Sequence, residues 1–228
     1  MPAAEGEWLQ QVCVTLGIQP TPDQCRRLLG YIDLLQRWNG TYNLTAVRDR
    51  AGMLLQHLAD CMAVVAPLSR HLHEAGRPEG RLLDVGSGGG LPGAVISILL
   101  PGLMVTCVDT VGKKAAFVRQ VAGALALPNL ESVHGRVESV QAPAFDVITS
   151  RAFAALTDFV RLTGDHLLPG AVWMAMKGQH PQHELEALPA SIDVFHVEQL
   201  HVPGLEAQRC LVWMRPRSAR IERVSESE

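Results

Sequence analysis

Hydrophobic side chains in the first third of the chain recur at helical spacing. Thr21 offers an N-cap, Pro22 fits the first helical turn and Gln24 occupies the capping-box position, so a helix is predicted from there to Gly40. Its apolar side is formed by Leu28, Leu29, Ile32, Leu35 and Trp38. A second helix is predicted from about Asp49 to Ala66, and the Arg-Pro-Glu-Gly sequence at 77–80 then ends the helical part.

From residue 81 onward the pattern changes to short apolar runs that alternate with helical stretches. The runs with the length and composition of buried strands are Leu82–Val85, Met104–Val108, Phe145–Thr149 and Ala171–Met176. The helices between or after them are expected to begin near Leu91, Gly112, Ala154 and Pro181. This alternation predicts right-handed crossovers and a mostly parallel, doubly wound α/β sheet. Two final runs, Ile192–Leu200 and Arg209–Met214, predict an antiparallel hairpin at the edge of that sheet.

The change of pattern also predicts the domain organisation. Residues 1–78 are expected to form an N-terminal helical extension packed on an α/β domain at 79–217, and residues 218–228 to form a polar tail. The longest apolar stretch, Ala94–Val108, is interrupted and shorter than the roughly 20 residues that a membrane span needs, so no span is expected. The N-terminus lacks the basic and apolar regions of a secretory signal, which favours a cytoplasmic location.

Composition narrows the possible chemistry. The formal net charge is −3, so any affinity for nucleic acid must come from local basic patches. The five cysteines are scattered and contain no CxxC pair, which argues against both a disulfide framework and a zinc site. The two histidine pairs, at 71 and 73 and at 180 and 183, have no matching carboxylate cluster, so no metal is expected.

The strongest chemical signal is a glycine loop between a predicted strand and a predicted helix. The segment runs Leu-Asp-Val-Gly-Ser-Gly-Gly-Gly-Leu-Pro-Gly from residue 83 to 93. Glycines let the backbone approach a ligand closely, and the following helix adds a positive field, so a nucleotide-like ligand is predicted. A dinucleotide fingerprint needs glycine where this chain has Leu91, whereas a G-x-G-x-G loop preceded by Asp84 fits methyltransferases better. A purely structural turn is the alternative.

Asp109 ends the next predicted strand, about 20 residues beyond the glycine loop. An acidic side chain at that position can accept hydrogen bonds from both hydroxyls of a ribose. Enzymes that use NAD have the same device, so Asp109 indicates a ribose rather than a particular cofactor. The alternative is that Asp109 caps the helix that begins near Gly112.

Taken together, these motifs resemble the ribosomal RNA small subunit methyltransferase G family, also called glucose-inhibited division protein B. The matching segments follow one another between residues 38 and 178: Trp38-Asn39, Asn43–Thr45, His57–Asp60, Asp84–Gly93, Val108-Asp109, Lys113-Lys114, Phe117, Gly135–Glu138, Ser150–Ala154, Leu168–Gly170 and Met176–Gly178. The resemblance implies a Rossmann-like class I methyltransferase fold with S-adenosylmethionine as cofactor. It also implies methylation of N7 of a guanine in the decoding region of 16S ribosomal RNA, with that RNA or the small ribosomal subunit as partner.

The resemblance also implies roles for single residues. The cofactor-binding residues would be Gly86, Ser87, Gly88 and Leu91 for methionine and ribose, Asp109 for ribose, Val137 and Glu138 for adenine, and Arg151. Arg151 would also be the catalytic residue, because it would border both the cofactor and the substrate. Its alternative is a structural ion pair with an acid such as Asp146. His57 and Asp60 could share a helix face near the site, although core packing and capping are the favoured interpretation.

Contacts with RNA phosphates are expected from Lys113, Lys114 and Lys177. For Lys113 and Lys114, and for Arg119 on the same predicted helix, an ordinary solvated helix face is an equal alternative. Three other functions remain open at this stage: a methyltransferase that acts on a small molecule or a protein, a nicotinamide-dependent oxidoreductase, and a non-catalytic ribosome-binding module with the same fold. Leu91 and the lack of an evident Tyr-x-x-x-Lys set count against the oxidoreductase.

Overall fold

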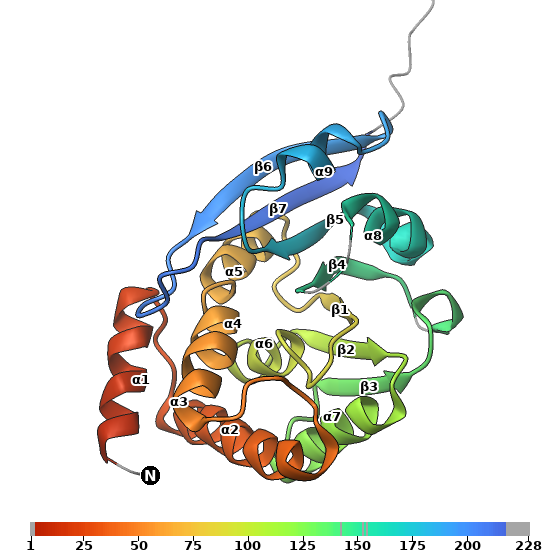
Figure 1. The fold of residues 1–228 in the computed structure, drawn as a ribbon. Helices are drawn as coiled ribbons and strands as arrows, with labels where there is room; N and C mark the ends of the chain where they lie inside the picture. The colour runs from red at the N-terminus through yellow and green to blue at the C-terminus, as the bar shows by residue number, and fades with distance from the viewer. Residues whose placement is uncertain (1–2, 142, 152, 154, 218–228) are drawn as a thin grey trace, which may run out of the picture.

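The computed structural model describes residues 3–141, 143–151, 153 and 155–217. Within these residues a seven-stranded sheet has the order β3-β2-β1-β4-β5-β7-β6, with helices on both faces (Figure 1). The strands are β1 Arg81–Val85, β2 Met104–Asp109, β3 Leu130–His134, β4 Phe145–Ser150, β5 Leu167–Lys177, β6 Ile192–Leu200 and β7 Arg209–Pro216. Strands β1 to β5 are parallel, and β7 runs antiparallel to both β5 and β6. The predicted doubly wound sheet with an antiparallel edge hairpin is therefore confirmed.

The sequence pattern missed β3. Its sequence, Leu-Glu-Ser-Val-His, contains only two apolar residues, and only Leu130 is buried. Strand β3 pairs with β2 alone and forms an edge of the sheet, so it has a neighbouring strand on one side only. An edge strand does not need a continuous apolar run, so a search for buried strands does not find it.

The helical elements are α1 Ala3–Thr15, α2 Pro22–Tyr42, α3 Arg50–Met53, a π-helix at Leu54–Ala59, α4 Asp60–Met62, α5 Val65–Glu74, α6 Gly93–Leu99, α7 Gly112–Ala124, α8 Leu156–Thr163 and α9 Gln182–Glu186, with short 3₁₀ turns at Val137–Ser139 and Gly164–His166. The predicted capping box is present: the Thr21 hydroxyl accepts from the Gln24 backbone N–H, and the Gln24 side chain accepts from the Thr21 N–H. Helix α2 continues two residues beyond Gly40, because Asn43 provides the left-handed C-cap. Ala154, the expected start of α8, lies outside the described residues.

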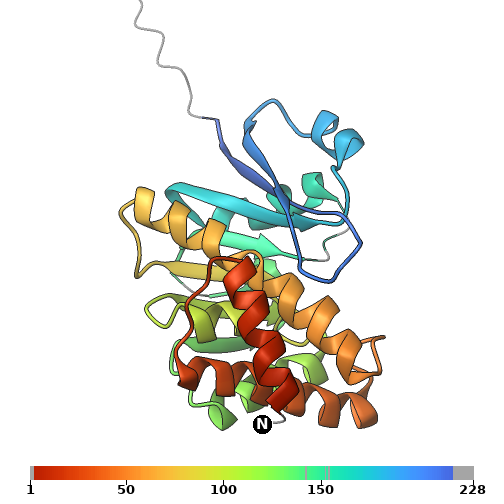
Figure 2. The same cartoon turned by 90° about the vertical axis from the view of Figure 1, so that its left-hand side faces the viewer.

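The N-terminal helices share one hydrophobic core with the sheet. A single cluster of buried side chains joins α1, α2 and the helical run 50–74 to β1, β2, α6 and α7. Figures 1 and 2 show α1 lying against the 50–74 run, and Arg50 bonds to Glu5 of α1. A second cluster on the other face of the sheet contains α8 and the 3₁₀ turn at 137–139. The pattern changes near residue 78, but the packing is continuous across that point.

Within the described part of the chain, one helical run, Arg50–Glu74, is long and apolar enough by composition to cross a membrane. Its most apolar window is 72% buried inside the fold. The apolar side chains of this run therefore form contacts with the rest of the protein. The predicted tail at 218–228 lies outside the described residues.

Candidate functional site

The carboxyl ends of the parallel strands bring the predicted site residues to one edge of the sheet. The glycine loop follows β1, Asp109 ends β2, Arg151 follows β4 and Lys177 ends β5. Because β7 is antiparallel, its first residue, Arg209, also lies at this edge, beside the pairing of Lys177 with Cys210. In doubly wound sheets this edge is where ligands bind.

The first cavity at this edge has a volume of about 440 Å³, within the range of small-molecule sites. Its lining residues are Val85, Gly86, Val108, Asp109, Thr110, Val111, Lys114, Gly135, Arg136, Val137, Glu138, Phe153 and Leu162. The lining therefore comes from the ends of β1 and β2, the start of α7, the turn after β3 and the segment after β4. Four residues that were predicted from widely separated motifs line this one cavity: Gly86, Asp109, Val137 and Glu138.

The glycine loop is shaped by contacts that exclude side chains. A Cβ atom on Gly93 would lie 2.5 Å from the Cys107 sulfur, so this position at the start of α6 accepts only glycine. Gly88 has a φ of 59°, in the left-handed region that favours glycine. The Asp84 carboxylate accepts from the Gly93 backbone N–H over 2.8 Å. Asp84 is fully buried, and burial raises its pKa to about 7. Its Oδ1 has no hydrogen-bond partner among the residues that the structure describes.

Asp109 lines the cavity and also holds the loop. Its Oδ2 accepts from the Gly88 N–H and its Oδ1 accepts from the Val111 N–H, both over 2.8 Å. The second of these contacts lies at the N-cap of α7, so the capping alternative describes part of what this side chain does. A carboxylate oxygen can accept more than one hydrogen bond, so both oxygens keep capacity for a ligand.

The remaining predicted cofactor residues divide between the cavity and the core. Val137 is buried and Glu138 exposed, and both border the cavity. Leu91 packs into the core cluster beneath the loop, and Ser87 is buried, with its carbonyl accepting from Gly90 and Leu91. Of the two adjacent lysines, Lys114 lines the cavity whereas Lys113 lies on the exposed side of α7. The sequence pattern did not identify the other lining side chains, such as Phe153 and Arg136, as cavity residues, although both fall within the matched motifs.

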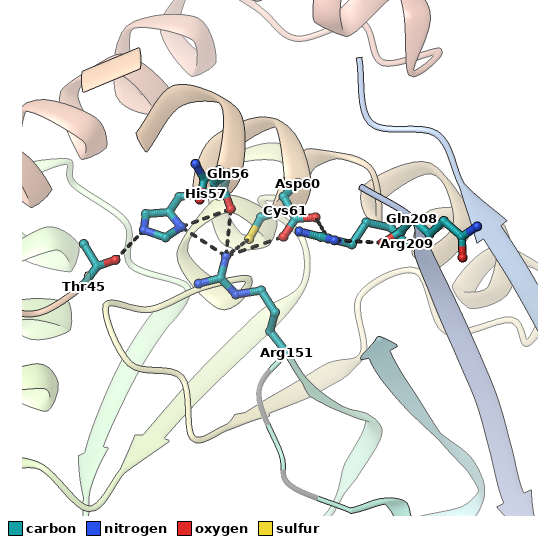
Figure 3. Close-up of polar contacts among 8 residues, drawn as sticks. All are labelled: Thr45, Gln56, His57, Asp60, Cys61, Arg151, Gln208 and Arg209. Carbon is teal, nitrogen blue, oxygen red and sulfur yellow. Dashed lines mark hydrogen bonds and ion pairs between the residues drawn. The ribbon is translucent and has the colours of Figure 1, made fainter. Parts of the chain in front are cut away.

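A second cavity of about 320 Å³ lies at the same edge, on the β5 and β7 side. It is lined by Gln56, His57, Asp60, Arg151, Met176, Lys177, Gly178 and Arg209. Figure 3 shows that Arg151 and Arg209 reach toward the helical run 54–62 from different strands. The lining therefore contains three cationic side chains, Arg151, Lys177 and Arg209, and one acid, Asp60.

Arg151 is anchored to the helical run by several contacts. Its Nη1 donates to the Gln56 carbonyl over 3.3 Å and lies 3.7 Å from the Asp60 Oδ2 (Figure 3). The alternative of an ion pair with an acid is present, but its partner is Asp60 and not Asp146, which lies near the opposite end of β4 and pairs with Arg77 over 2.8 Å. Asp60 is buried, as core packing predicted, but it also lines the second cavity beside His57, and its carboxylate pairs with both Arg151 and Arg209.

The π-helix explains how a backbone carbonyl becomes available to Arg151. In an α-helix the N–H of Asp60 would bond to the Gln56 carbonyl, but here it bonds to the carbonyls of His57 and Leu55. The Gln56 oxygen therefore accepts from side chains instead. A π-helical turn has the same residue types as an ordinary helix, so the sequence pattern gives no signal of it.

His57 lies between Thr45 and Arg151. Its Nδ1 is 3.1 Å from the Gln56 carbonyl and its Nε2 is 2.7 Å from the Thr45 hydroxyl (Figure 3). A carbonyl only accepts, so we assign the proton to Nδ1 and infer that Nε2 accepts from Thr45. Burial, together with the neighbouring Arg151 charge, lowers the pKa of His57 to about 4. The ring is therefore neutral at physiological pH.

The other two cations of the second cavity are held by acids. The Lys177 Nζ lies 2.7 Å from the Glu184 Oε2, which also accepts from the Leu156 N–H. Arg209 donates from Nε to the Asp60 Oδ1 over 2.7 Å. The sequence motifs singled out Lys177 but not Arg209, which is 149 residues from Asp60 along the chain. Among the residues that the structure describes, no three His, Cys, Asp or Glu side chains gather as metal ligands would.

The fold matches solved methyltransferases. TrmN from Thermus thermophilus aligns with a TM-score of 0.54 and 22% identity, covering 68% of this chain and 48% of that one. A SAM-dependent methyltransferase from Aquifex aeolicus aligns with a TM-score of 0.51 and 18% identity, covering 67% of this chain and 90% of that one. At these identities the likeness establishes the fold, which is the class I methyltransferase fold predicted from the motifs.

Sequence comparison establishes the family. The family model for rRNA small subunit methyltransferase G matches residues 24–212. The chain is 60% identical over 203 residues to the ribosomal RNA small subunit methyltransferase G of Leptothrix cholodnii, covering 89% of this chain and 92% of that protein. The family-model match includes the glycine loop, the segment after β4, all of β6 and the first half of β7. The chain therefore belongs to the ribosomal RNA small subunit methyltransferase G family.

Proposed function

We propose that this protein transfers the methyl group of S-adenosylmethionine to N7 of a guanine in the decoding region of 16S ribosomal RNA. The observation that carries the proposal is the pair of cavities at one edge of the sheet. Arg151 lines the second cavity, and Phe153, two residues later, lines the first. A cofactor in the first cavity and a target base in the second would meet beside this segment. Family membership supports ribosomal RNA as the substrate.

The first cavity has the donors and acceptors that S-adenosylmethionine requires. Asp109 would accept hydrogen bonds from the ribose hydroxyls, since its carboxylate lies on the cavity wall. Val137 would pack on the adenine, and Glu138 or nearby backbone would accept from the adenine amino group. The backbone from Gly86 through Ser87 to Gly88 would border the methionine and ribose part, with Leu91 supporting it from beneath.

Methyl transfer to N7 does not require a general base. When bound, S-adenosylmethionine supplies an electrophilic methyl group on a positively charged sulfur. Guanine N7 carries a free lone pair at neutral pH, so it would take the methyl group directly, with S-adenosylhomocysteine as the leaving group and the positive charge passing to the guanine. No proton leaves the base. The protein would contribute mainly by holding the two atoms in line at roughly 3 to 3.5 Å.

Arg151 would orient the reactants without moving a proton, because a guanidinium is always charged at physiological pH. The Gln56 carbonyl and the Asp60 carboxylate would keep the guanidinium in place. With a pKa of about 4, His57 gains no proton between pH 6 and pH 8. Neither Arg151 nor His57 should therefore make the single-turnover rate depend on pH in that range when the cofactor is saturating. Asp84, whose pKa is raised to about 7 by burial, holds the glycine loop, so its titration should act on cofactor binding instead.

Local charge, not net charge, would attract the RNA. Arg209 and Lys177 surround the second cavity, and Lys114 lies beside the first, with Lys113 next to it on α7. We expect these cations to contact phosphates near the target nucleotide. At Lys177 a phosphate would compete with the Glu184 carboxylate, which lies 2.7 Å from the amine. Because 16S RNA and small ribosomal subunits are cytoplasmic, we expect the enzyme there.

The test is methylation of small ribosomal subunits from cells that lack this protein. Purified protein and labelled S-adenosylmethionine are added, and the 16S RNA is mapped by mass spectrometry. We expect a single added methyl group on N7 of one guanine. A methyl group on an exocyclic amine or a ring carbon would refute the mechanism. Methylation of a protein or small molecule instead would favour another substrate, and micromolar binding of NAD without binding of S-adenosylmethionine would favour an oxidoreductase.

A further inference from the structure

Helix α2 contacts the cofactor loop from the side opposite the sheet. Tyr31, near the middle of α2, is fully buried, and its hydroxyl donates to the Gly89 carbonyl over 2.8 Å. The two residues are 58 positions apart along the chain. Burial raises the pKa of Tyr31 well above its usual range, so the hydroxyl keeps its proton and remains a donor.

The contacted carbonyl belongs to a peptide group that is held at both ends. Tyr31 binds the carbonyl of the Gly89-Gly90 peptide, and the N–H of the same peptide donates to the Ser87 carbonyl over 2.9 Å. The residues before and after Gly89, which are Gly88 and Gly90, have φ angles of 59° and 80°. Fixing the plane of this peptide restricts the ψ angle of Gly89 and the φ angle of Gly90. It therefore helps to set the path of the loop past the first cavity.

Side chains of α2 and α7 lie close to Gly89. A Cβ atom on Gly89 would lie 3.4 Å from Leu35 and 3.7 Å from Phe117. Helix α2 also holds the far end of the following helix, because the Gln24 side chain donates to the carbonyls of Ile98 and Leu99 over 2.9 and 3.2 Å. One helix of the N-terminal region thus contacts both the loop and the end of α6.

We propose that Tyr31 is a positioning residue for the cofactor: its hydroxyl orients the Gly89-Gly90 peptide and so fixes the glycine loop before the cofactor binds. The inference rests on the proposed binding of S-adenosylmethionine. Tyr31 lies beneath the loop and acts only through it, so it takes no part in the methyl transfer itself. A loop that is ordered in advance loses less conformational freedom on binding, which strengthens affinity.

The test is Tyr31→Phe, which removes the hydroxyl and keeps the ring in the core. We expect the Kd for S-adenosylmethionine, measured by calorimetry, to rise roughly 5- to 10-fold, as for the loss of one buried hydrogen bond. The Kd for S-adenosylhomocysteine should rise by the same factor, because the two molecules share every part that the loop would border. The kcat at saturating cofactor and the KM for RNA should not change.

The matched control is Arg50→Gln. Arg50 pairs with Glu5 of α1 and Asp33 of α2, so its loss loosens the N-terminal helices at a place away from the loop. We expect a lower melting temperature for this variant and a wild-type Kd for the cofactor. A wild-type Kd in Tyr31→Phe, or an equal rise in Arg50→Gln, would overturn the inference.

Hydrogen exchange gives a second measurement that needs no variant. In the protein without cofactor, the Gly90 amide should already be protected, because its peptide is fixed in advance. Rapid exchange of that amide would contradict a preformed loop. If the wild-type protein does not bind S-adenosylmethionine at all, the proposed function fails, and that result is distinct from either outcome for Tyr31.

Discussion

Replacing Asp60 with asparagine is expected to separate RNA binding from methyl transfer. Asp60 is almost fully buried, and its two oxygens face Arg209 at 2.7 Å and Arg151 at 3.7 Å. One carboxylate therefore aligns two guanidinium groups that come from β7 and from the end of β4. Asparagine has nearly the same size but carries no charge, and it directs one N–H2 group where an acceptor was.

The structure gives the size of the effect on stability. The Arg209 contact is short and charge-assisted, and removing it should cost about 1.5 to 3 kcal/mol. The Arg151 contact is longer, and the Gln56 carbonyl still holds that guanidinium, so we expect it to add little. For a protein of this size, each kcal/mol lowers the melting temperature by about 2 to 4 °C.

Asp60→Asn should lower the rate of methyl transfer without lowering the affinity for RNA. Without Asp60 the second cavity keeps Arg151, Lys177 and Arg209 but no lining acid, so RNA affinity should stay the same or rise. The single-turnover rate should fall on the order of 10- to 100-fold, because the Gln56 carbonyl alone would fix the position of the Arg151 guanidinium less precisely than Gln56 and Asp60 together. Filter binding at several salt concentrations and a rapid-quench methylation assay measure the two quantities.

A matched control is Asp158→Asn, which removes an exposed acid paired with Arg161 on α8. It should leave RNA affinity and rate unchanged and should have little effect on stability. An unchanged rate in Asp60→Asn would show that Asp60 does not orient Arg151. A large loss of RNA affinity would show that Asp60 itself contacts the substrate, and either result would refute the reasoning.

Three further side-chain environments lead to separate predictions. Asp109→Ala should weaken the binding of S-adenosylmethionine by about 1 to 3 kcal/mol in calorimetry, since ribose hydroxyls lose their acceptor; an unchanged Kd would restrict Asp109 to capping and loop support. Since the folded-state pKa of His57 is about 4, below the value near 6.5 expected in the unfolded chain, its contribution to stability should be complete above pH 6.5 and should diminish as the pH falls toward 4. The free energy of unfolding in urea should be measured against pH for wild type and for His57→Gln, and its change between pH 6.5 and pH 4 should differ by at most about 3 kcal/mol between the two proteins. Parallel curves of unfolding free energy against pH would contradict the lowered pKa of His57. Charge reversal at Lys113 and Lys114 should lower the slope of log K against log salt by roughly 0.7 to 0.9 for each phosphate that the variant no longer binds, and an unchanged slope would place the RNA elsewhere.

The sequence by itself determined the elements whose pattern is local. The capping box before α2 is made by residues three positions apart, and the buried strands β1, β2, β4 and β5 are recognisable because burial on both faces requires an apolar run. The glycine loop is also readable, since contacts such as Gly93 against Cys107 leave no room for a side chain. These features together indicated the fold class and the place of the first cavity.

Only the tertiary structure decided which side chains act together in the second cavity. The Asp60 pair with Arg209 and the bond from Tyr31 to Gly89 join residues 149 and 58 positions apart, and neither pairing leaves a periodic trace in the sequence. The π-helix likewise looks like an ordinary helix in the residue pattern, although it releases the Gln56 carbonyl to Arg151. Local spacing reports which face of an element is buried, whereas partners across the fold are chosen by how the elements pack, and that choice is a property of the whole chain.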